Sequence, residues 1–334
     1  METIKDLKVN LESKVLASKN IVIVPHTNID FDAFASAIGI SLIVSKLQKP
    51  NSIIIDDSSY KLDSSVRSVI EDAKGKFNII SKDKYKQDED DLFILTDVNK
   101  SELICLKDEL KKVDKDKIFI IDHHYEGQTT VDSNYKFIRT SSSSASEIVV
   151  KLLNLFKVKY SPEIANYLLA GIYLDTNKLT NNTTSDTFKI VGKLMDSGAS
   201  NSVIDNWFAE DFESDKRVLE LISKAIIYKY SYAVVVADDE LEYTRAELAK
   251  VSDYLLKYGV DAAFAIGNVG ENLISISARS KEKVNVGEVM KCLGGGGNQR
   301  SAATKLENTE VNEVTKQLKK IMDPPFLIET KKGK

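Results

Sequence analysis

The stretch Ile118-Phe119-Ile120-Ile121-Asp122-His123-His124 joins four apolar residues to three polar residues that suit metal binding. An apolar run without alternation predicts a strand that is buried on both faces of a parallel sheet. The polar triplet follows at once, so we expect it at the carboxyl end of that strand, where open α/β sheets bind their ligands. This stretch therefore predicts both a fold class and a site.

A second stretch near the N-terminus has the same arrangement. The apolar run Ile21-Val22-Ile23-Val24 precedes His26-Thr27-Asn28-Ile29-Asp30-Phe31-Asp32, and the chain's three histidines all lie in these two motifs. Carboxylates interleaved with histidines suit a divalent metal such as Mn²⁺ or Fe²⁺, whereas a structural zinc site favours thiolates. Each residue taken singly has a structural alternative, such as Asp32 as a helix N-cap. Their coincidence at strand ends favours metal binding.

The first half of the chain alternates strands with helices. Apolar runs end near Val24, Ile55, Ile80, Leu95 and Ile121. Helical periodicity is visible over Ala33–Leu47, and Ser101–Leu110 is predicted as a helix with Ser101 as its N-cap. This alternation predicts an α/β fold with a doubly wound, mainly parallel sheet.

The second half predicts a different organisation. Residues 145 to 228 are mostly helical in pattern, and a smaller α/β unit follows. We therefore predict a catalytic domain over 1–195, a helical connector over 196–228 and a substrate-binding domain over 229–328.

Composition limits the range of partners. The 334 residues carry a net charge of −4, which argues against bulk attraction to duplex nucleic acid or an anionic membrane. Cys105 and Cys292 lie far apart in sequence and are interpreted as free thiols in a reducing compartment. The N-terminus lacks an apolar signal core, and no apolar run reaches the roughly 20 residues of a membrane helix. The prediction is a cytoplasmic protein.

Six side chains are candidate metal ligands: His26, Asp30, Asp32, Asp97, His123 and Asp175. Six ligands are too many for one ion that must keep open positions. Two ions that share a bridging carboxylate accommodate them, and such a pair can clamp a phosphodiester and activate water.

These motifs resemble those of the DHH phosphoesterases, a family named for the triplet that Asp122-His123-His124 matches. The resemblance is strongest to the catalytic part of cyclic-di-AMP phosphodiesterases, through Ser143-Ser144-Ala145-Ser146-Glu147 and Ser277-Ala278-Arg279-Ser280. It implies a stand-alone catalytic unit without the membrane helices and sensory domains that often precede that part.

The resemblance also implies a role for each site residue. One Mn²⁺ would be held by His26, Asp30 and Asp97. The other would be held by Asp32, Asp97, His123 and Asp175, with Asp97 bridging. Asp122 would orient a ligand, and His124 would donate to an oxygen of the scissile phosphate.

A glycine run near the C-terminus resembles the glycine motif of the DHH-associated domain. By itself, such a run is more often a flexible turn. With the resemblance, the candidate substrate-binding residues are Arg279, Gly295, Gly296, Gly297, Asn298 and Arg300. The family usually has His where Asn298 stands and often has Arg near Asn182, so we expect altered contacts with the nucleotide.

The resulting prediction is an Mn²⁺-dependent phosphodiesterase that opens cyclic di-AMP to linear pApA. One alternative is a nano-RNase or a phosphatase of 3′-phosphoadenosine 5′-phosphate, and pyrophosphate hydrolysis ranks lower. An alternative from another class is a nucleotide-binding sensor without catalysis. The expected partners are a cyclic dinucleotide or a very short oligoribonucleotide, and a homodimer is left open.

Overall fold

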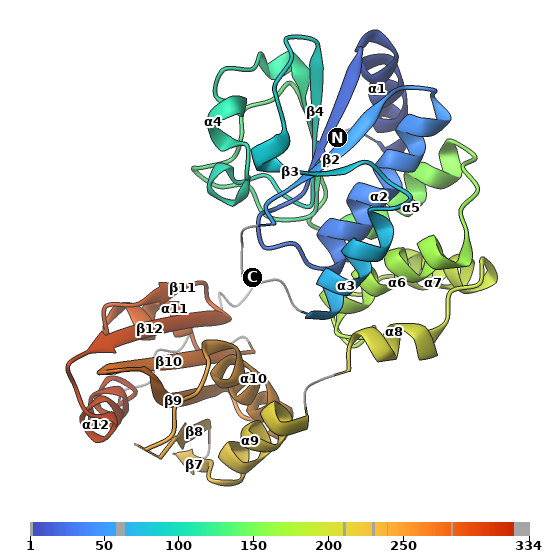
Figure 1. Cartoon of the computed structure of the whole chain (residues 1–334). Coiled ribbons are helices and arrows are strands. Elements are labelled where there is room, and N and C mark those ends of the chain that lie inside the picture. Colours follow the sequence, from blue (N-terminus) through green and yellow to red (C-terminus); the bar gives the residue numbers. More distant parts are fainter. Residues whose placement is uncertain are drawn as a thin grey trace, which may run out of the picture. The chain divides into compact units, whose positions relative to one another are not determined.

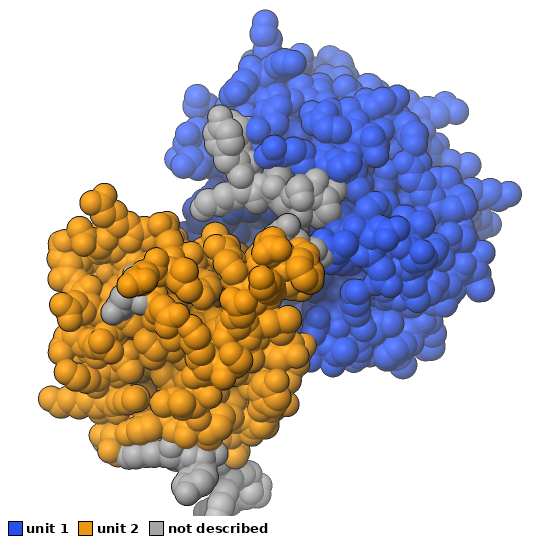
Figure 2. All heavy atoms as spheres, turned by 60° about the horizontal axis from the view of Figure 1, so that its bottom comes forward, with its two compact units in different colours: residues 1–209 blue, residues 210–334 orange. Residues whose placement is uncertain are grey.

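The computed structural model describes residues 3–57, 64–209, 212–228, 231–238, 240–281 and 283–323. The chain divides into two compact units, residues 1–209 and 210–334, which are coloured separately in Figure 2. Each unit has a sheet and a hydrophobic core of its own, so each is described by itself.

The first unit is built on a sheet of six parallel strands in the order β3-β2-β1-β4-β5-β6 (Figure 1). The strands are β1 (Asn20–Val24), β2 (Asn51–Ile55), β3 (Ile79–Ser81), β4 (Asp91–Thr96), β5 (Ile118–Asp122) and β6 (Tyr135–Ile138). This arrangement confirms the predicted doubly wound parallel sheet. The chain order reverses between β1 and β4, and such a reversal opens a crevice at the carboxyl ends of the two strands.

The two faces of this sheet are covered differently. Ile23 and Ile94 belong to a core shared with long helices, whereas Val24 and Leu95, one residue further, pack against the connection between β4 and β5. This alternation follows from strand geometry. The helices of the first unit are α1 (Ile4–Ala17), α2 (Phe31–Lys46), α3 (Ser64–Ala73), α4 (Lys107–Leu110), α5 (Ala145–Leu155), α6 (Pro162–Thr176), α7 (Ser185–Asp196) and α8 (Asn201–Trp207).

The connection between β4 and β5 differs from the prediction. The single helix predicted over Ser101–Leu110 is wrong: a 3₁₀ turn covers Ser101–Leu103, and α4 begins only at Lys107. Between them, Ile104 is extended and forms an antiparallel bridge with His26. The tertiary pairing of Ile104 therefore overrides the local helical pattern.

The second unit contains a mixed sheet in the order β11-β12-β10-β9-β8-β7. Its strands are β7 (Ile226–Tyr228), β8 (Tyr232–Val236), β9 (Ala262–Gly270), β10 (Leu273–Ser280), β11 (Gly296–Gly297) and β12 (Ser301–Glu307). Only the β8–β9 pair is parallel among the described strand pairs of this sheet. The helices are α9 (Phe212–Ser223), α10 (Arg245–Leu255), α11 (Val286–Lys291) and α12 (Val311–Ile321).

The segment predicted as a connector, 196–228, contributes to both units. It contains α8 of the first unit and α9 and β7 of the second, and the division falls between Ala209 and Glu210. The domain predicted over 229–328 ends beyond Asp323, the last described residue.

Among the described residues, no helix combines the length and the apolarity needed to cross a lipid bilayer. Cys105 and Cys292 are both free thiols.

Candidate metal centre

The side chains of the two sequence motifs lie close together at the crevice between β1 and β4. His26 follows β1, Asp97 follows β4, and Asp122 is the last residue of β5. Asp30 and Asp32 stand at the start of α2, and Asp175 lies in the last turn of α6. The structure thus brings together residues that lie up to about 150 positions apart in sequence.

These side chains form three overlapping groups, each with its ligand atoms within 4.8 Å of one another. The groups are His26, Asp30 and Asp97; Asp32, His123 and Asp175; and Asp97, Asp122, His123 and His124. All six predicted metal ligands, together with Asp122 and His124, therefore lie in one place.

Asp97 faces both histidine groups with different oxygens. Its Oδ2 lies 3.5 Å from Nε2 of His26, and its Oδ1 lies 3.3 Å from Nε2 of His123. Asp97 is also one of the described non-glycine residues with positive φ, at +57°, and its backbone N–H donates to the carbonyl of Ile121 at 3.0 Å. Left-handed backbone at a non-glycine residue is uncommon and recurs at functional sites. This conformation lets one buried carboxylate reach toward both groups.

The remaining distances complete the two groups. Nε2 of His26 lies 3.5 Å from Oδ2 of Asp30. Nε2 of His123 lies 3.0 Å from Oδ2 of Asp175 and 3.8 Å from Oδ2 of Asp32.

Three buried atoms of this cluster lack a hydrogen bond of good geometry within the described part of the chain, although Nε2 of His123 lies 3.3 Å from Oδ1 of Asp97 and 3.0 Å from Oδ2 of Asp175. Buried polar atoms are normally satisfied, so unpaired atoms that converge on one point need a missing partner. The donors are carboxylate oxygens and imidazole nitrogens, a set that suits Mn²⁺ or Fe²⁺. The residues present therefore fit bound divalent cations.

The electrostatics of the two ligand histidines agree with this fit. Burial lowers the pKa of His26, but Asp30 and Asp97 outweigh it and raise the pKa to about 10. Burial also lowers the pKa of His123, which Asp175 and Asp97 raise to about 11. The surrounding carboxylates therefore favour a positive charge at both positions.

The carboxylates show the same excess of negative charge. Burial and the charge of Asp175 raise the pKa of Asp32 to about 7. Burial and the charge of Asp32 raise the pKa of Asp97 to about 6. Carboxylates buried beside one another resist ionisation until a cation joins them.

Asp32 is held by the start of α5 and does not cap α2. The N-cap of α2 is Asp30, whose Oδ1 accepts from the backbone N–H groups of Asp32 and Ala33, so the alternative of Asp32 as N-cap is wrong. Both oxygens of Asp32 instead accept from backbone N–H groups, of Ala145 at 2.7 Å and Ser146 at 2.8 Å. A helix N-terminus suits a carboxylate, so α5 fixes the direction in which Asp32 points.

Asp122 orients the neighbouring imidazole. Its Oδ1 lies 2.9 Å from Nδ1 of His124 and accepts from the backbone N–H of His123 at 2.7 Å. Burial opposes the ionisation of Asp122, yet the contact with His124 holds its pKa below the ordinary range. The same contact raises the pKa of His124. This contact uses Nδ1 of His124, and the residue lines the cavity over the centre.

Asn99 is a site residue that the sequence analysis missed. Its Nδ2 donates to Oδ2 of Asp122 at 2.6 Å and to the carbonyl of His124 at 3.1 Å, and its side chain is buried. It stands two residues after Asp97, and that proximity was the only signal in the sequence.

The cavity over this centre has a volume of about 340 Å³. Its lining residues are His26, Asn28, Asp30, Asp97, Val98, Asn99, Lys100, Leu103, Asp122, His124 and Asp175.

The predicted substrate-binding residues lie in the second unit. Gly296 and Gly297 form β11 and pair with Ala302 and Ala303 of β12. Gly297 has a φ of +146°, and a Cβ there would lie 2.4 Å from Cα of Ala302, so this position requires glycine. A Cβ at Gly295 would lie 2.3 Å from the carbonyl oxygen of Ala303.

The polar members of this set already have partners within the unit. Oδ1 of Asn298 accepts from the backbone N–H groups of Arg300 at 2.9 Å and Ser301 at 2.8 Å. Nε of Arg279 donates to Oδ1 of Asp253 at 2.9 Å. Asn298 thus holds the turn after the glycines. Asn182, the second departure, is exposed between α6 and α7, with φ of +53°.

Comparisons with known proteins match two domains in this chain. The model of the DHH family, N-terminal domain, matches residues 20–172, and the model of the DHHA1 domain matches residues 228–323. The chain is 30% identical over 328 residues to cyclic-di-AMP phosphodiesterase GdpP of Bacillus subtilis, which covers 95% of this chain and 49% of that protein. It is 31% identical over 309 residues to a membrane protein–large ribosomal subunit bL9 fusion protein of Onion yellows phytoplasma, which covers 89% of this chain and 36% of that protein. The chain thus spans half or less of the length of these relatives.

A solved structure shares the fold. The crystal structure of an exopolyphosphatase-related protein from Bacteroides fragilis matches with a TM-score of 0.78 and 19% identity, over 96% of both chains. Two matched domains in sequence order, on a fold with the triplet at the end of β5, lead to one conclusion: the chain belongs to the DHH family and carries a DHHA1 domain after its DHH domain.

Proposed function

We propose that this chain is an Mn²⁺-dependent phosphodiesterase that hydrolyses cyclic di-AMP to linear pApA. The observation that carries the proposal is Asp97, whose Oδ2 lies 3.5 Å from Nε2 of His26 and whose Oδ1 lies 3.3 Å from Nε2 of His123. The similarity to cyclic-di-AMP phosphodiesterases over nearly the whole chain supports this substrate class. We also predict a cytoplasmic location, which would suit a nucleotide substrate.

The site residues divide into proposed metal ligands and a proposed hydrogen-bond donor. His26, Asp30 and Asp97 would hold one cation, and Asp32, Asp97, His123 and Asp175 the other. When bound, two such cations polarise the phosphoryl group and supply an activated water.

His124 would donate a hydrogen bond from an orientation that Asp122 fixes. Its Nδ1 lies 2.9 Å from Oδ1 of Asp122, which raises the pKa of the ring and so favours the form in which Nε2 also carries a proton. Its Nε2–H can then donate to a phosphoryl oxygen that gains charge in the transition state, as preorganised donors do. Asn99 supports this arrangement by holding both Asp122 and the backbone of His124.

Hydrolysis of linear substrates is the second candidate, as a nano-RNase or a phosphatase of 3′-phosphoadenosine 5′-phosphate. The observation that favours it is Asn298 in place of the family's usual histidine, because an amide carries no charge. A sensor without catalysis is disfavoured, since the metal-ligand groups are complete.

One experiment ranks these candidates. Cyclic di-AMP, linear diadenylate and 3′-phosphoadenosine 5′-phosphate are supplied in parallel to the Mn²⁺-loaded full chain, and kcat/KM is measured for each. We expect cyclic di-AMP to give the highest value, with pApA as product. A higher value for either linear substrate would reverse the ranking. Binding of cyclic di-AMP without turnover of any of the three would favour a sensor.

A further inference from the structure

One lysine is among the residues that line the cavity over the candidate metal centre. Lys100 is the one lysine or arginine among the described residues that line it, and the cavity also holds four aspartates, Asp30, Asp97, Asp122 and Asp175. A lysine beside a centre for divalent cations opposes their binding by like-charge repulsion. The charge of Lys100 lowers the pKa of Glu102, which does not line the cavity, and would also attract an anion that enters the cavity.

The backbone of Lys100 is firmly placed. The residue follows Asn99, forms an antiparallel bridge with Thr130, and accepts a hydrogen bond from the N–H of Leu103 at 3.0 Å through its carbonyl. The side chain is half-buried. Because Asn99 also holds Asp122, the anchor of Lys100 and the triplet share one hydrogen-bond network.

The ammonium group of Lys100 has no carboxylate within 4.0 Å in the described part of the chain. Lysines elsewhere in this unit do pair, for example Lys82 with Asp56 at 2.8 Å and Lys111 with Asp108 at 2.8 Å. Lys100 lines an acidic cavity and still pairs with none of its acids. Such a cation is available to a ligand.

We propose that Lys100 binds a phosphate oxygen of the substrate, at a position separate from the one that His124 serves. An ammonium is a compact charge with three donors, which suits the non-bridging oxygens of a phosphate. Asn28, an exposed amide in the lining of the same cavity, adds a neutral donor. The inference rests on the proposed function for its phosphate chemistry but does not require cyclic di-AMP as substrate.

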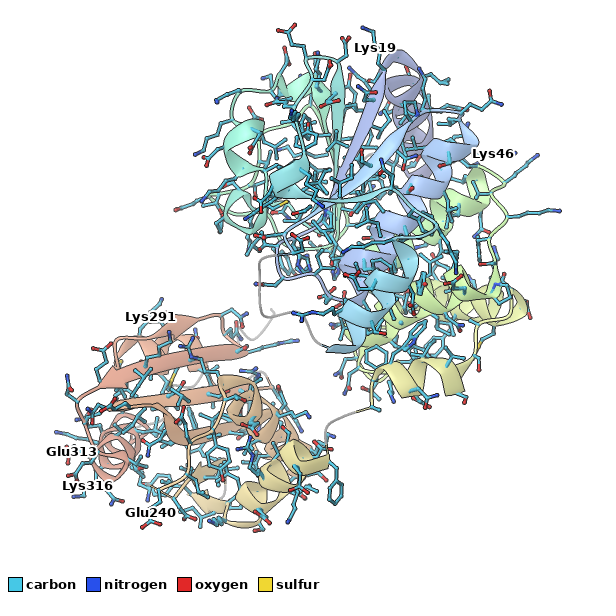
Figure 3. The ribbon with its side chains drawn as sticks, viewed as in Figure 1. Lys19, Lys46, Glu240, Lys291, Glu313 and Lys316 are labelled. Carbon is cyan, nitrogen blue, oxygen red and sulfur yellow. The ribbon has the colours of Figure 1, made fainter. Side chains whose placement is uncertain are left out.

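The test uses the Mn²⁺-loaded full chain with three variants: Lys100→Met, Lys100→Arg and Lys46→Met. Lys46 is the matched control, because it is exposed at the far end of α2, about 24 Å along the helix from Asp30 by helical rise (Figure 3). AMP is the probe for the phosphate contact, and adenosine is its counterpart without phosphate. The affinities for AMP, adenosine and Mn²⁺ are measured by calorimetry.

We expect Lys100→Met to weaken AMP binding by about tenfold or more, as loss of a hydrogen bond to a charged group does. Adenosine binding should not change, and Mn²⁺ affinity should be equal or higher because a repelling charge is gone. Lys100→Arg should recover most of the AMP affinity, and Lys46→Met should match the wild type.

Two results would overturn the inference. One is unchanged AMP affinity in Lys100→Met. The other is a parallel loss of AMP and Mn²⁺ affinity, which would mean that Lys100 only supports the fold of the centre. If the wild type turns over no cyclic di-AMP while Lys100→Met still weakens AMP binding, the proposed function fails and this inference stands.

Discussion

Asp97 contacts both histidine groups of the candidate metal centre with one side chain. It is 3% exposed, its backbone is left-handed, and its oxygens face different histidines. Substitutions of Asp97 can therefore distinguish the effect of its charge from the effect of its shape.

Asp97→Asn removes the charge and keeps the shape. Asn also tolerates left-handed backbone, which makes it a milder change than Ala. We expect kcat/KM with Mn²⁺ to fall by about 10³-fold or more, since cation stabilisation of the transition state amounts to several kcal/mol. Circular dichroism in EDTA should show an unchanged fold. Near-normal turnover in this variant would rule out a shared carboxylate.

Variants of His123 and His124 should differ in whether they lose Mn²⁺ affinity or turnover. His123→Ala removes a ligand, so its Mn²⁺ affinity should fall by at least about tenfold. His124→Gln removes a donor to the phosphoryl oxygen, so kcat should fall by about 10²–10³ with little change in Mn²⁺ affinity. Calorimetry and steady-state kinetics on both variants measure this difference. Equal loss of metal in both variants would contradict the assignment.

Substitution of Asn298 tests what this residue does in place of the histidine that the family usually has after the glycines. Asn298→His removes the oxygen that accepts from the backbone N–H groups of Arg300 and Ser301. We expect a loss of about 1 kcal/mol in the free energy of unfolding of the second unit, measured by urea denaturation of the full chain. Asn298→Asp keeps an acceptor oxygen and serves as the control. If Asn298→His were as stable as wild type, the turn would not depend on this side chain.

At the scale of elements, the start of α5 positions the centre. Asp32 accepts from its first N–H groups, and Glu147 in its first turn is buried and accepts from Ser143 and Thr187. The Thr187 contact ties α5 to α7. Gly171 of α6 lies against the same place, where a Cβ would be 2.4 Å from Oγ of Ser146 and 2.9 Å from Oδ1 of Asp32. Helix packing thus determines where Asp32 points.

Gly171→Ala should push Asp32 out of place. We expect a cost of about 1–3 kcal/mol in stability from overpacking, together with weaker Mn²⁺ binding. Gly192→Ala in α7 is the matched control, because a Cβ there meets nothing within 4 Å. The control should gain about 0.5–1 kcal/mol from reduced backbone entropy in a helix. Thermal melts and Mn²⁺ titrations compare the two, and equal gains in both would mean that α6 has room beside Asp32.

At the scale of the whole molecule, the chain consists of two units with separate cores. Within the described residues, the groups of side chains that could hold a metal ion all belong to the first unit. A ligand that binds only the folded state stabilises the unit that holds it. The two units should therefore respond differently to metal.

Mn²⁺ should raise the melting temperature of the first unit, and EDTA should reverse the shift, while the second unit is unaffected. The shift should grow as pH rises from 6 to 8. Protons occupy Asp32, with pKa about 7, and the two ligand histidines, with pKa about 10 and 11, and metal must displace them. Differential scanning calorimetry of wild type and Asp97→Asn measures this. A shift that is equal at both pH values, or present in Asp97→Asn, would argue against metal at this centre.

Much of the fold and the centre could be predicted from sequence because the signals are local. Continuous apolar runs predict five of the parallel strands. The polar residues that follow them predict the candidate ligands His26, Asp97 and His123, since parallel strands end at one edge. The sixth strand, β6, was missed because Tyr135-Lys136-Phe137-Ile138 has no continuous apolar run, and it becomes a strand through its pairing with β5.

Only the tertiary structure decided the features that depend on distant partners. Ile104 is extended because it pairs with His26, so a helix could not continue through it. Asn99 became part of the site because Asp122, 23 residues away, needs a donor for its second oxygen. Asp32 is held by α5 rather than capping α2, since Ala145 and Ser146 offer N–H groups across more than 100 residues of chain. Residue types and their spacing determine which groups are available, whereas packing determines which of them meet.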